Sequence, residues 1–575
     1  MKKNTLYKVM AAAMVGVMTM GALTGCGGKN DGGASSSVKE STTAGSAVAS
    51  TDAGTSDTVA GIDGWEPFAQ KVTLQIPVYD RGSSANGCSD VVNNYWTKWV
   101  QENFGDKYNI TVEYVGITRS DVMTDYAMLA AGKDLPTICM EYDYDKLASW
   151  QADGYLQTYD VEQFKQIAPT YWATMVEHGN DAYTKLADED YLVLGYRPYG
   201  NTTYTWCTFY RQDWLEEAGF KEYPYGDNTK LLELYAKLVE NGHKYPLSGK
   251  KVSGAGIDQN YGYRDYPQDE TTWVTTGDYQ IPALSTEAQK RFLKWENELY
   301  NDGYYNPEYY MRDSSEAEAD FINGEAFTWT GYISSNVNVL KSFYEANPDA
   351  VLGVAVTPST WTQDETWGSS PSYRPGTNFG MMIGFANDAT EDEVKAAMMY
   401  LEWLNQPENL FTMQWGIEGV NFTYDENGDP VAVSDQTGLA EQQGHNNNVD
   451  YWCAVTAVKT LGSIEKDIRA VTPSGIPQDF YDQILANYNG QVAIYEAGKA
   501  NSDCLFATSI DAVTEYNQTL YDLYTEYRDK LTMCSKDQFD ALYDELSQKY
   551  LEAGYQEVID GRQEAFDNGQ TTRLQ

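Results

Sequence analysis

The sequence predicts an α/β protein. Alternating apolar and polar residues from Lys71 to Val78 predict a β-strand, and a similar run spans Asn109 to Val115. A helical pattern from Val122 to Ala131 follows, and Leu135–Met140 predicts a third strand. Strands and helices that alternate at these spacings are typical of a parallel sheet covered by helices.

Local signals mark the ends of these elements. A polar loop, Tyr79–Gly82, separates the first strand from a helix expected at about Asp90 to Phe104. Asp121 is expected to cap the helix that begins at Val122, and Gly132 is expected to end it. About 510 of the 575 residues follow residue 61, which suggests two or three domain-sized units.

The amino terminus carries the marks of a secretory signal. Three lysines lie within the first eight residues, and an apolar run from Val9 to Leu23 follows. The run is shorter than the roughly 20 residues that a membrane-spanning helix needs. It ends in Leu23-Thr-Gly-Cys26, which resembles the bacterial lipobox. The resemblance implies that residues 1–25 are a lipoprotein signal peptide and that Cys26 carries acyl chains that hold the protein at the outer face of the cell membrane. The alternative is a plain secreted protein with an incidental thiol at Cys26.

A flexible tether is expected between the anchor and the folded body. Residues 27–61 contain no aromatic, Leu or Ile residue and consist mainly of Gly, Ser, Thr, Ala and Asp. Such a segment cannot bury enough apolar surface to offset its chain entropy, so residues 26–61 are predicted to be disordered. The reach of this tether is roughly 30 Å. No later stretch is apolar enough to cross a bilayer.

The charge and the rarer residue types exclude several classes of function. The formal net charge is −44, from 40 basic and 84 acidic residues, which argues against binding to nucleic acid or to anionic lipid head groups. None of the seven cysteines lies in a C-x-x-C pair, so a zinc or thioredoxin-type site has no support. The six cysteines beyond Cys26 fit small core side chains, with disulfides left open. Only three histidines occur, far apart in the sequence, so a histidine-based triad or metal site is not expected.

Aromatic residues are in excess. The chain has 46 Tyr, 15 Trp and 17 Phe. Tyr and Trp combine an apolar face with a polar group, which matches the apolar faces and hydroxyl edges of sugar rings. Many of these residues could equally be core, so their positions must decide between the two roles.

Several segments of the body together resemble one family. Spread from about residue 70 to 565, they resemble segments of the maltodextrin-type (family 1) solute-binding proteins of ABC importers. Within that family they resemble the branch of long Gram-positive lipoproteins. The segments are Met128–Ile138, Leu147–Leu156, Tyr210–Gly219, Phe321–Trp329 with its F-x-x-G-x-A pattern, and Gly416–Tyr424 followed by Glu426-Asn-Gly428. Their order along the chain carries more weight than any one of them.

The resemblance implies a two-lobed, periplasmic-binding-protein-like fold of class II, in which a hinge joins two α/β lobes around a ligand cleft. The expected lobes are residues 62–203 with 358–412, and 204–357 with 413–575. It also implies that the protein is no enzyme, needs no cofactor, acts as a monomer, and captures an oligosaccharide for separate ABC permease chains. The alternatives are a surface-anchored glycoside hydrolase, which needs two suitably spaced carboxylates, and a peptide receptor of the same fold.

Candidate ligand-binding residues lie in loops that follow the predicted strands, because open α/β sheets bind ligands at the carboxyl ends of their strands. These residues mix aromatic faces with groups that pair with vicinal hydroxyls. The predicted set is Tyr79, Asp80, Arg81, Glu141, Tyr142, Asp143, Trp206, Trp329, Tyr332, Tyr373, Arg374, Asp450, Tyr451 and Trp452.

A metal site is not expected. Some long members of the family carry a calcium loop, but the corresponding segment here, Glu240–Pro246, lacks alternating oxygen ligands. Asp425–Asp429 is followed by Pro430 and lacks a bidentate Glu, so an Asn-Gly hairpin turn is the better interpretation.

Overall fold

The computed structural model describes residues 61–81, 90–249, 281–333, 337–358, 375–432, 448–471, 478–500 and 504–573. The chain divides after Asp57, and all described residues belong to the unit that begins at Thr58. The proposed signal peptide, Cys26, the tether to residue 60, Tyr373 and Arg374 lie outside the described residues.

The first strands form where the sequence predicts them. Strand β1 (Val72–Asp80) pairs in parallel with β2 (Ile110–Thr118), from Val72 opposite Ile110 to Asp80 opposite Thr118. Between them lies α1 (Tyr95–Val100), which continues through a π-helical turn (Gln101–Gly105) into α2 (Asp106–Tyr108). The predicted helix at Asp90–Phe104 is thus confirmed in type but starts later.

The third strand corrects the expectation of a purely parallel sheet. Strand β3 (Ile138–Glu141) pairs antiparallel with β11 (Phe379–Ala386), a strand more than 200 residues further along the chain. β11 also pairs antiparallel with β4 (Leu156–Gln157) and β7 (Val193–Tyr196). All eight residues of β11 are buried, as in a central strand covered on both faces.

Helix α3 (Val122–Gly132) differs from the expectation at both ends. The Asp121 side chain makes no capping hydrogen bond, and Lys133 rather than Gly132 takes the left-handed conformation (φ 58°) that ends the helix. Asp125, one turn inside the helix, instead accepts a hydrogen bond from the Thr118 backbone N–H at 2.6 Å.

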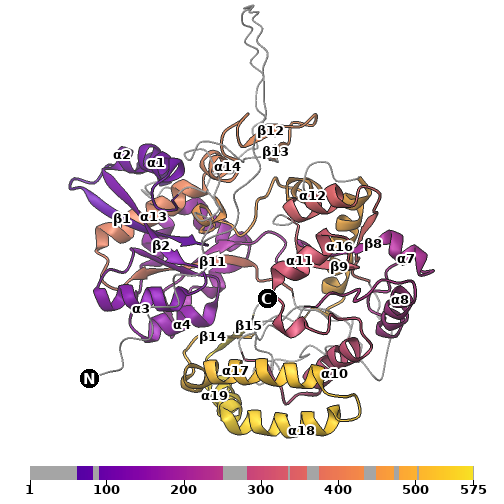
Figure 1. Ribbon diagram of the computed structural model, residues 1–575. Coiled ribbons are helices and arrows are strands. Elements are labelled where there is room, and N and C mark those ends of the chain that lie inside the picture. The colour runs from indigo at the N-terminus through magenta and orange to yellow at the C-terminus, as the bar shows by residue number, and fades with distance from the viewer. Residues whose placement is uncertain are drawn as a thin grey trace, which may run out of the picture. The chain divides into compact units, whose positions relative to one another are not determined.

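One hydrophobic core surrounds these strands. Helix α13 (Glu391–Asn405) lies against β1, and α4 (Tyr144–Ala152) packs on β3 and β11 (Figure 1). The segment Tyr451–Val455 also packs in this core. That packing differs from the expected assignment of residues 413–575 to the second lobe.

A second sheet has its own cores. Its strand order is β10 (Leu352–Val354), β8 (Trp206–Arg211) and β9 (Thr328–Tyr332), all antiparallel. One core contains side chains from β8, α11 (Ser314–Ile322), α12 (Val337–Ala346) and α16 (Gln478–Glu496). Another is built around α7 (Gln212–Glu217), α8 (Asn228–Glu240), α10 (Glu287–Asn301) and the late helices α17 (Asp511–Met533) and α18 (Phe539–Tyr550).

Two sheets with separate cores make this a two-lobed α/β fold. The chain leaves the first sheet after β7, enters the second at β8, and returns between β10 and β11. The remaining elements are α5 (Val161–Ile167), α6 (Pro169–Glu177), β5 (Lys185–Leu186), β6 (Glu189–Asp190), α14 (Pro407–Trp415), β12 (Phe422–Tyr424), β13 (Pro430–Ala432), α15 (Ile464–Val471), β14 (Cys504–Phe506), α19 (Gln556–Asp567) and β15 (Thr571–Arg573).

Two predicted local motifs are confirmed. Helix α11 ends at Ile322, Gly324 takes a positive φ of 75°, and β9 follows, as expected of the F-x-x-G-x-A step. Strands β12 and β13 form the expected hairpin, in which Asp425 accepts hydrogen bonds from the backbone N–H groups of Asn427 (2.8 Å) and Asp429 (2.9 Å).

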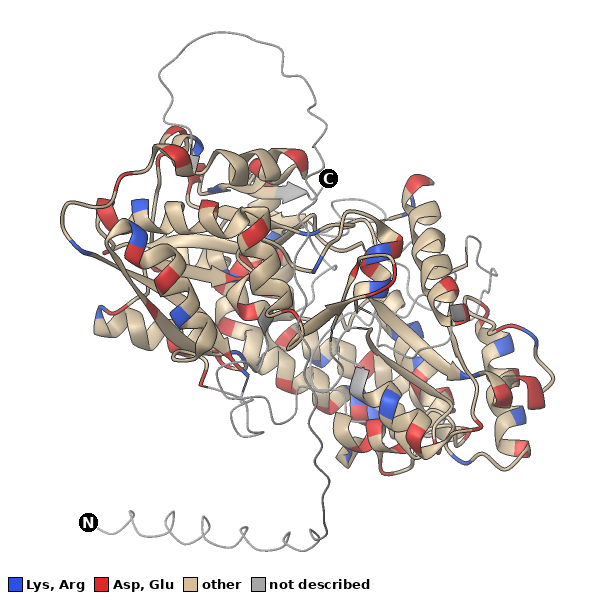
Figure 2. Ribbon diagram, turned by 90° about the horizontal axis from the view of Figure 1, so that it is seen from above, with Lys and Arg blue, Asp and Glu red and all other residues tan. Residues whose placement is uncertain are grey.

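Cysteines and charges follow simple patterns. Four of the five cysteines within the described residues are buried, and Cys534 is half-buried. Acidic side chains are spread along the helices, with fewer Lys and Arg among them (Figure 2).

Candidate functional site

Polar and charged side chains gather where three strands of the first lobe end. Strands β1 and β2 are parallel and end opposite each other, so the residues that follow them, Arg81 and Arg119, emerge at one edge of the sheet. Strand β3 contributes Glu141 as its last residue and Tyr142 directly after it.

Arg81 binds Asp450 across 369 residues of sequence. Its Nε lies 3.0 Å from Oδ2 of Asp450, and Nη2 lies 2.9 Å from Oδ1, a bidentate geometry. The Asp450 side chain is 1% exposed, whereas that of Arg81 is 35% exposed. Burial raises the pKa of the Asp450 carboxyl, and the hydrogen bonds from Arg81 oppose that rise. The predicted residues Arg81 and Asp450 are therefore brought together.

Glu141 is buried between two cations. Its Oε1 accepts a hydrogen bond from the Tyr142 N–H at 2.8 Å, and its Oε2 lies 3.8 Å from Arg119 Nη1 and 3.7 Å from Lys146 Nζ. The Arg119 guanidinium also lies over the ring of Tyr79, 5.0 Å from its centroid. These contacts join three strand ends into one cluster.

Sequence reasoning missed Arg119 and Lys146. Arg119 directly follows β2, as Arg81 directly follows β1. The sequence predicts that this strand ends at Val115, but β2 extends three residues further, to Thr118, so the prediction did not place Arg119 at a strand end. Lys146 lies on α4, one turn after the predicted Asp143.

The other predicted residues of this lobe have structural contacts. Tyr79 is fully buried, donates a hydrogen bond to the Met140 carbonyl at 3.0 Å, and has its pKa raised well above the ordinary value by burial. Asp143 caps α4 through the Asp145 N–H, and Asp80 is half-buried at the end of β1.

Tyr451 and Trp452 lie inside the first core. They are 4% and 3% exposed, and the Tyr451 hydroxyl donates a hydrogen bond to the Val91 carbonyl at 2.9 Å. Neither ring is an open platform in this conformation, and their role in binding stays a prediction.

The second sheet presents an open aromatic pair. Trp206 and Tyr332 are opposite each other on β8 and β9, are 41% and 50% exposed, and meet edge to face with centroids 4.4 Å apart. Thr208 and Thr330, the next residues on the same face, share a hydrogen bond of 2.8 Å between their hydroxyls.

Trp329 points to the other face of this sheet. It is opposite Phe209, and its ring stacks between Phe209 (6.0 Å) and Phe321 (5.9 Å) beside the core. Because side chains alternate along a strand, Trp206 and Tyr332 can face solvent only if Trp329 faces inward.

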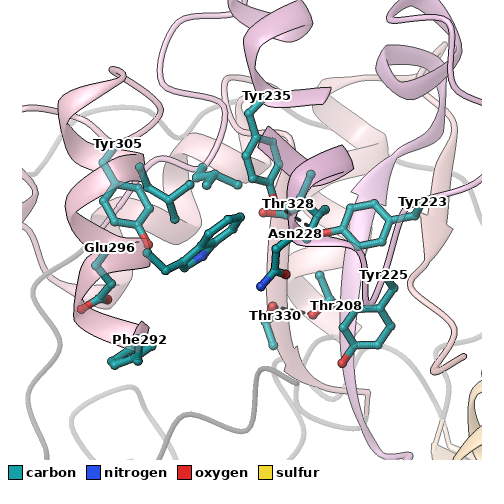
Figure 3. A pocket seen from close by; sticks show the side chains of 14 residues that line it. Thr208, Tyr223, Tyr225, Asn228, Tyr235, Phe292, Glu296, Tyr305, Thr328 and Thr330 are labelled. Carbon is teal, nitrogen blue, oxygen red and sulfur yellow. Dashed lines mark hydrogen bonds between the residues drawn. The ribbon is translucent and has the colours of Figure 1, made fainter. Parts of the chain in front are cut away.

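A cavity of about 170 Å³ lies beside the open face. It is lined by threonines of β8 and β9 and by side chains from α8, α10 and the loops around them (Figure 3). The lining residues are Thr208, Tyr223, Tyr225, Asn228, Leu231, Tyr235, Leu247, Phe292, Trp295, Glu296, Leu299, Tyr305, Thr328 and Thr330. Apart from the loop tyrosines and Leu247, these residues lie within regular elements, where no local sequence signal marks them as binding residues.

A family comparison identifies the type of protein. Residues 90–410, more than half of the chain, match the family of bacterial extracellular solute-binding proteins. The chain belongs to this family. The family resemblance expected from the sequence is confirmed, and the solute-binding protein has the two-lobed fold that the resemblance implies.

Solved structures with the same fold include three carbohydrate-related proteins. One is an ABC-transporter-associated solute-binding protein from Bifidobacterium longum infantis that binds HMO (13% identity, TM-score 0.58). Two are from Streptococcus pneumoniae: FusA in complex with kestose (12%, 0.58) and the N-glycan transport protein NgtS (13%, 0.52). Each comparison covers 87% of this chain and 99% of the other. No curated protein matches the chain.

Neither a membrane-spanning helix nor a metal-binding cluster is found among the described residues. No helix among them is both long and apolar enough to span a bilayer. Within the same residues, no group of three or more His, Cys, Asp or Glu side chains is arranged to hold a metal ion.

Proposed function

We propose that this solute-binding protein captures an oligosaccharide outside the cell and delivers it to an ABC importer. In this proposal the lipidated Cys26 holds the protein at the membrane surface, the permease is formed by separate chains, and the protein acts as a monomer without catalysis. The family supports the class of function, and three structural neighbours with carbohydrate ligands or cargo support the substrate class.

The exposed pair of Trp206 and Tyr332 is the observation that carries the proposal. Two large rings at 41% and 50% exposure meet edge to face on one face of the sheet and present apolar surface to solvent. The apolar face of a sugar ring can stack there, while the Thr208 and Thr330 hydroxyls lie one step along the same face to meet sugar hydroxyls.

The charged cluster of the first lobe offers complementary contacts. Arg81 and Arg119 present guanidinium groups, and Asp450 and Glu141 hold them in place. Planar guanidinium edges pair with vicinal hydroxyls, and their positions are fixed before ligand binds, which lowers the ordering cost.

Calorimetry on Trp206→Ala tests the proposal. We expect an oligosaccharide from a glycan array to bind the wild type, and Trp206→Ala to lose about 2 kcal/mol, roughly thirtyfold in affinity. The matched control is Tyr424→Ala, which removes another exposed aromatic (48% exposed) from the β12–β13 hairpin and is expected to leave binding unchanged.

Three outcomes would contradict the proposal in different ways. Normal binding by Trp206→Ala would place the ligand elsewhere. Binding of peptides but of no oligosaccharide would assign a different substrate class. Release of shorter products from a bound oligosaccharide would show a hydrolase.

A further inference from the structure

The cavity of the second lobe is lined by the residues next to Trp206 and Tyr332 on the same face of the sheet. Trp206 is opposite Tyr332, Thr208 is opposite Thr330, and Thr328 is the next residue of β9 on the same face. All three threonines line the cavity. A ligand that lies along this face therefore passes from the two exposed rings directly to the cavity.

Aromatic side chains form the walls. Figure 3 shows Tyr223 and Tyr225 on the same side as Thr208 and Thr330, with Phe292, Glu296 and Tyr305 across from them. Tyr235 and Trp295, each 4% exposed, and Phe292, 1% exposed, belong to the second-lobe core. The lining of the cavity is thus buried at these three residues and exposed to solvent at Thr330, on the side of the sheet.

Its size suits one sugar ring. A volume of about 170 Å³ greatly exceeds the roughly 10–15 Å³ that a single water requires. It is smaller than the roughly 300–1,000 Å³ of sites that enclose drug-sized ligands. A longer piece of an oligosaccharide would therefore extend outward along the sheet.

The polar groups of the cavity are matched to a neutral ligand. Hydroxyls of Thr208 and Thr330 and of Tyr223 and Tyr235 lie along it. Of the described residues that line the cavity, Glu296 carries the only charged side chain, a carboxylate. Arg528 forms an ion pair with Glu296, with Nε of Arg528 2.7 Å from Oε2 of Glu296. The Arg528 guanidinium therefore binds the Glu296 carboxylate. Because Arg528 balances the charge of Glu296, the described lining offers a ligand carboxylate no cation with which to pair.

We infer that this cavity is an end subsite, which takes one uncharged sugar unit at the terminus of the bound oligosaccharide. The inference rests on the proposed function and adds the orientation of the ligand to it. The end of the oligosaccharide enters the cavity, and the following sugar units lie over Trp206 and Tyr332. A terminal uronic acid would lose its hydration without finding a cation among the described lining residues, and a ligand whose end is blocked cannot enter.

The test uses the full-length protein and the tightest-binding oligosaccharide of a glycan array. Thr330→Tyr narrows the exposed side of the cavity with a residue that suits a strand, and it should lower affinity at least tenfold. Thr330→Val keeps the shape but removes one hydroxyl, and a loss of about three- to tenfold is expected. Thr423→Tyr makes the same change at an exposed strand position of the β12–β13 hairpin and should bind normally.

A second experiment tests directly which terminus of the oligosaccharide enters the cavity. The same oligosaccharide is labelled with a bulky fluorophore at one end or at the other, and one label should reduce affinity at least tenfold while the other has little effect. On the array, ligands with a neutral end should bind at least tenfold more tightly than their uronic-acid-terminated counterparts.

The outcomes separate this inference from the proposed function. If Thr330→Tyr binds as the wild type does, or both labelled ligands bind equally, the end subsite is wrong while oligosaccharide capture stands. If the wild type binds no oligosaccharide, both ideas fail. Unchanged melting temperatures of the variants confirm that a loss reflects the site and not unfolding.

Discussion

At the scale of single residues, the direction of a side chain from its strand separates binding from packing. Trp206 and Trp329 are both tryptophans on adjacent strands of one sheet, and both were predicted to bind ligand. Trp206 is exposed beside Tyr332, whereas Trp329 stacks between two phenylalanines beside the core. Their substitutions should therefore affect different properties.

We expect Trp329→Ala to reduce folding stability by about 2–4 kcal/mol, because it removes a large ring from a stacked set of aromatics. Trp206→Ala should change stability by less than about 1 kcal/mol, because its ring is exposed. Chemical denaturation of both variants measures the difference. A stable Trp329→Ala variant that no longer binds sugar would instead support the ligand-binding role predicted for Trp329.

Lys459 is a second residue with an unusual environment. It is half-buried, and its ammonium lies 4.3 Å from the centroid of the Trp415 ring. Burial lowers the pKa of Lys459 from an ordinary 10.5 to about 8. The unfolded chain keeps this proton up to about pH 10.5, so the wild type gains stability as the pH rises from about 8 to 10.5.

Lys459→Met should therefore stabilise the protein at pH 7, where the cost of burying the charge is present in full. A shift of this size, reduced for partial exposure, corresponds to about 1–2 kcal/mol. The methionine keeps an apolar contact with Trp415. Denaturation at pH 7 and pH 10 tests this, since the gain should shrink at the higher pH. A gain that is the same at both values would rule out a titrating Lys459.

At the scale of elements, strong local patterns were predicted well and pairings were not. The alternation at Lys71–Val78 and the run at Asn109–Val115 contain enough contrast to identify β1 and β2. The pairing of β3 with β11 joins segments more than 200 residues apart, and nothing local to either segment encodes it. An apolar run such as β11 has no polar alternation, so its partners cannot be inferred from its pattern.

The candidate site shows the same limit. Arg81 and Asp450 were both proposed from loop positions, but the bidentate contact between them joins residues that are 369 positions apart in the sequence and depends on the fold of the chain between them. The five-residue strand β9, Thr-Trp-Thr-Gly-Tyr, does not indicate from sequence which alternate set faces outward. Trp329 and Tyr332 were predicted to lie in a loop after Phe327, whereas both belong to β9, where their separation by three residues places them on opposite faces.

Helix α10 depends on a helix from the end of the chain. Glu296 on α10 and Arg528 on α17 form a buried ion pair, with both side chains 9% exposed. Arg528→Met leaves the carboxylate buried without its partner, and we expect a loss of about 3–5 kcal/mol in folding stability.

The double variant Glu296→Gln with Arg528→Met should recover most of that loss, because no unpaired charge remains. The free energies of unfolding of the wild type, the two single variants and the double variant together form a double-mutant cycle, and chemical denaturation measures them. If the single and double variants are equally unstable, the arginine acts through packing against Phe292, over whose ring it lies at 5.1 Å.

At the scale of the whole molecule, the proposed lipid anchor would determine where the two lobes work. The proposal rests on the apolar run at Val9–Leu23, the lipobox-like Leu23–Cys26 and the low-complexity segment that follows it. The formal net charge of −44 argues against docking on anionic lipid head groups. In the proposed arrangement, attachment would therefore depend on the acyl chains of Cys26.

Cys26→Ala should abolish acylation and release the protein to the medium or leave the signal uncut. Membrane fractionation and labelling with a palmitate analogue measure both effects. A matched Cys534→Ala variant, which changes a half-buried thiol of the folded body, should stay membrane-bound. A Cys26→Ala protein that is still processed and acylated would contradict the lipobox interpretation.

The alternation along β8 and β9 also bears on how such a protein changes over evolutionary time. Residues proposed to meet the ligand and residues that pack against the core alternate along the same two short strands and face opposite ways. Selection for a new nutrient can therefore act on one set without eroding the other. Directed evolution can use the same separation, with randomised codons at four sites and the intervening residues left unchanged. Those four sites are Trp206, Thr208, Thr330 and Tyr332.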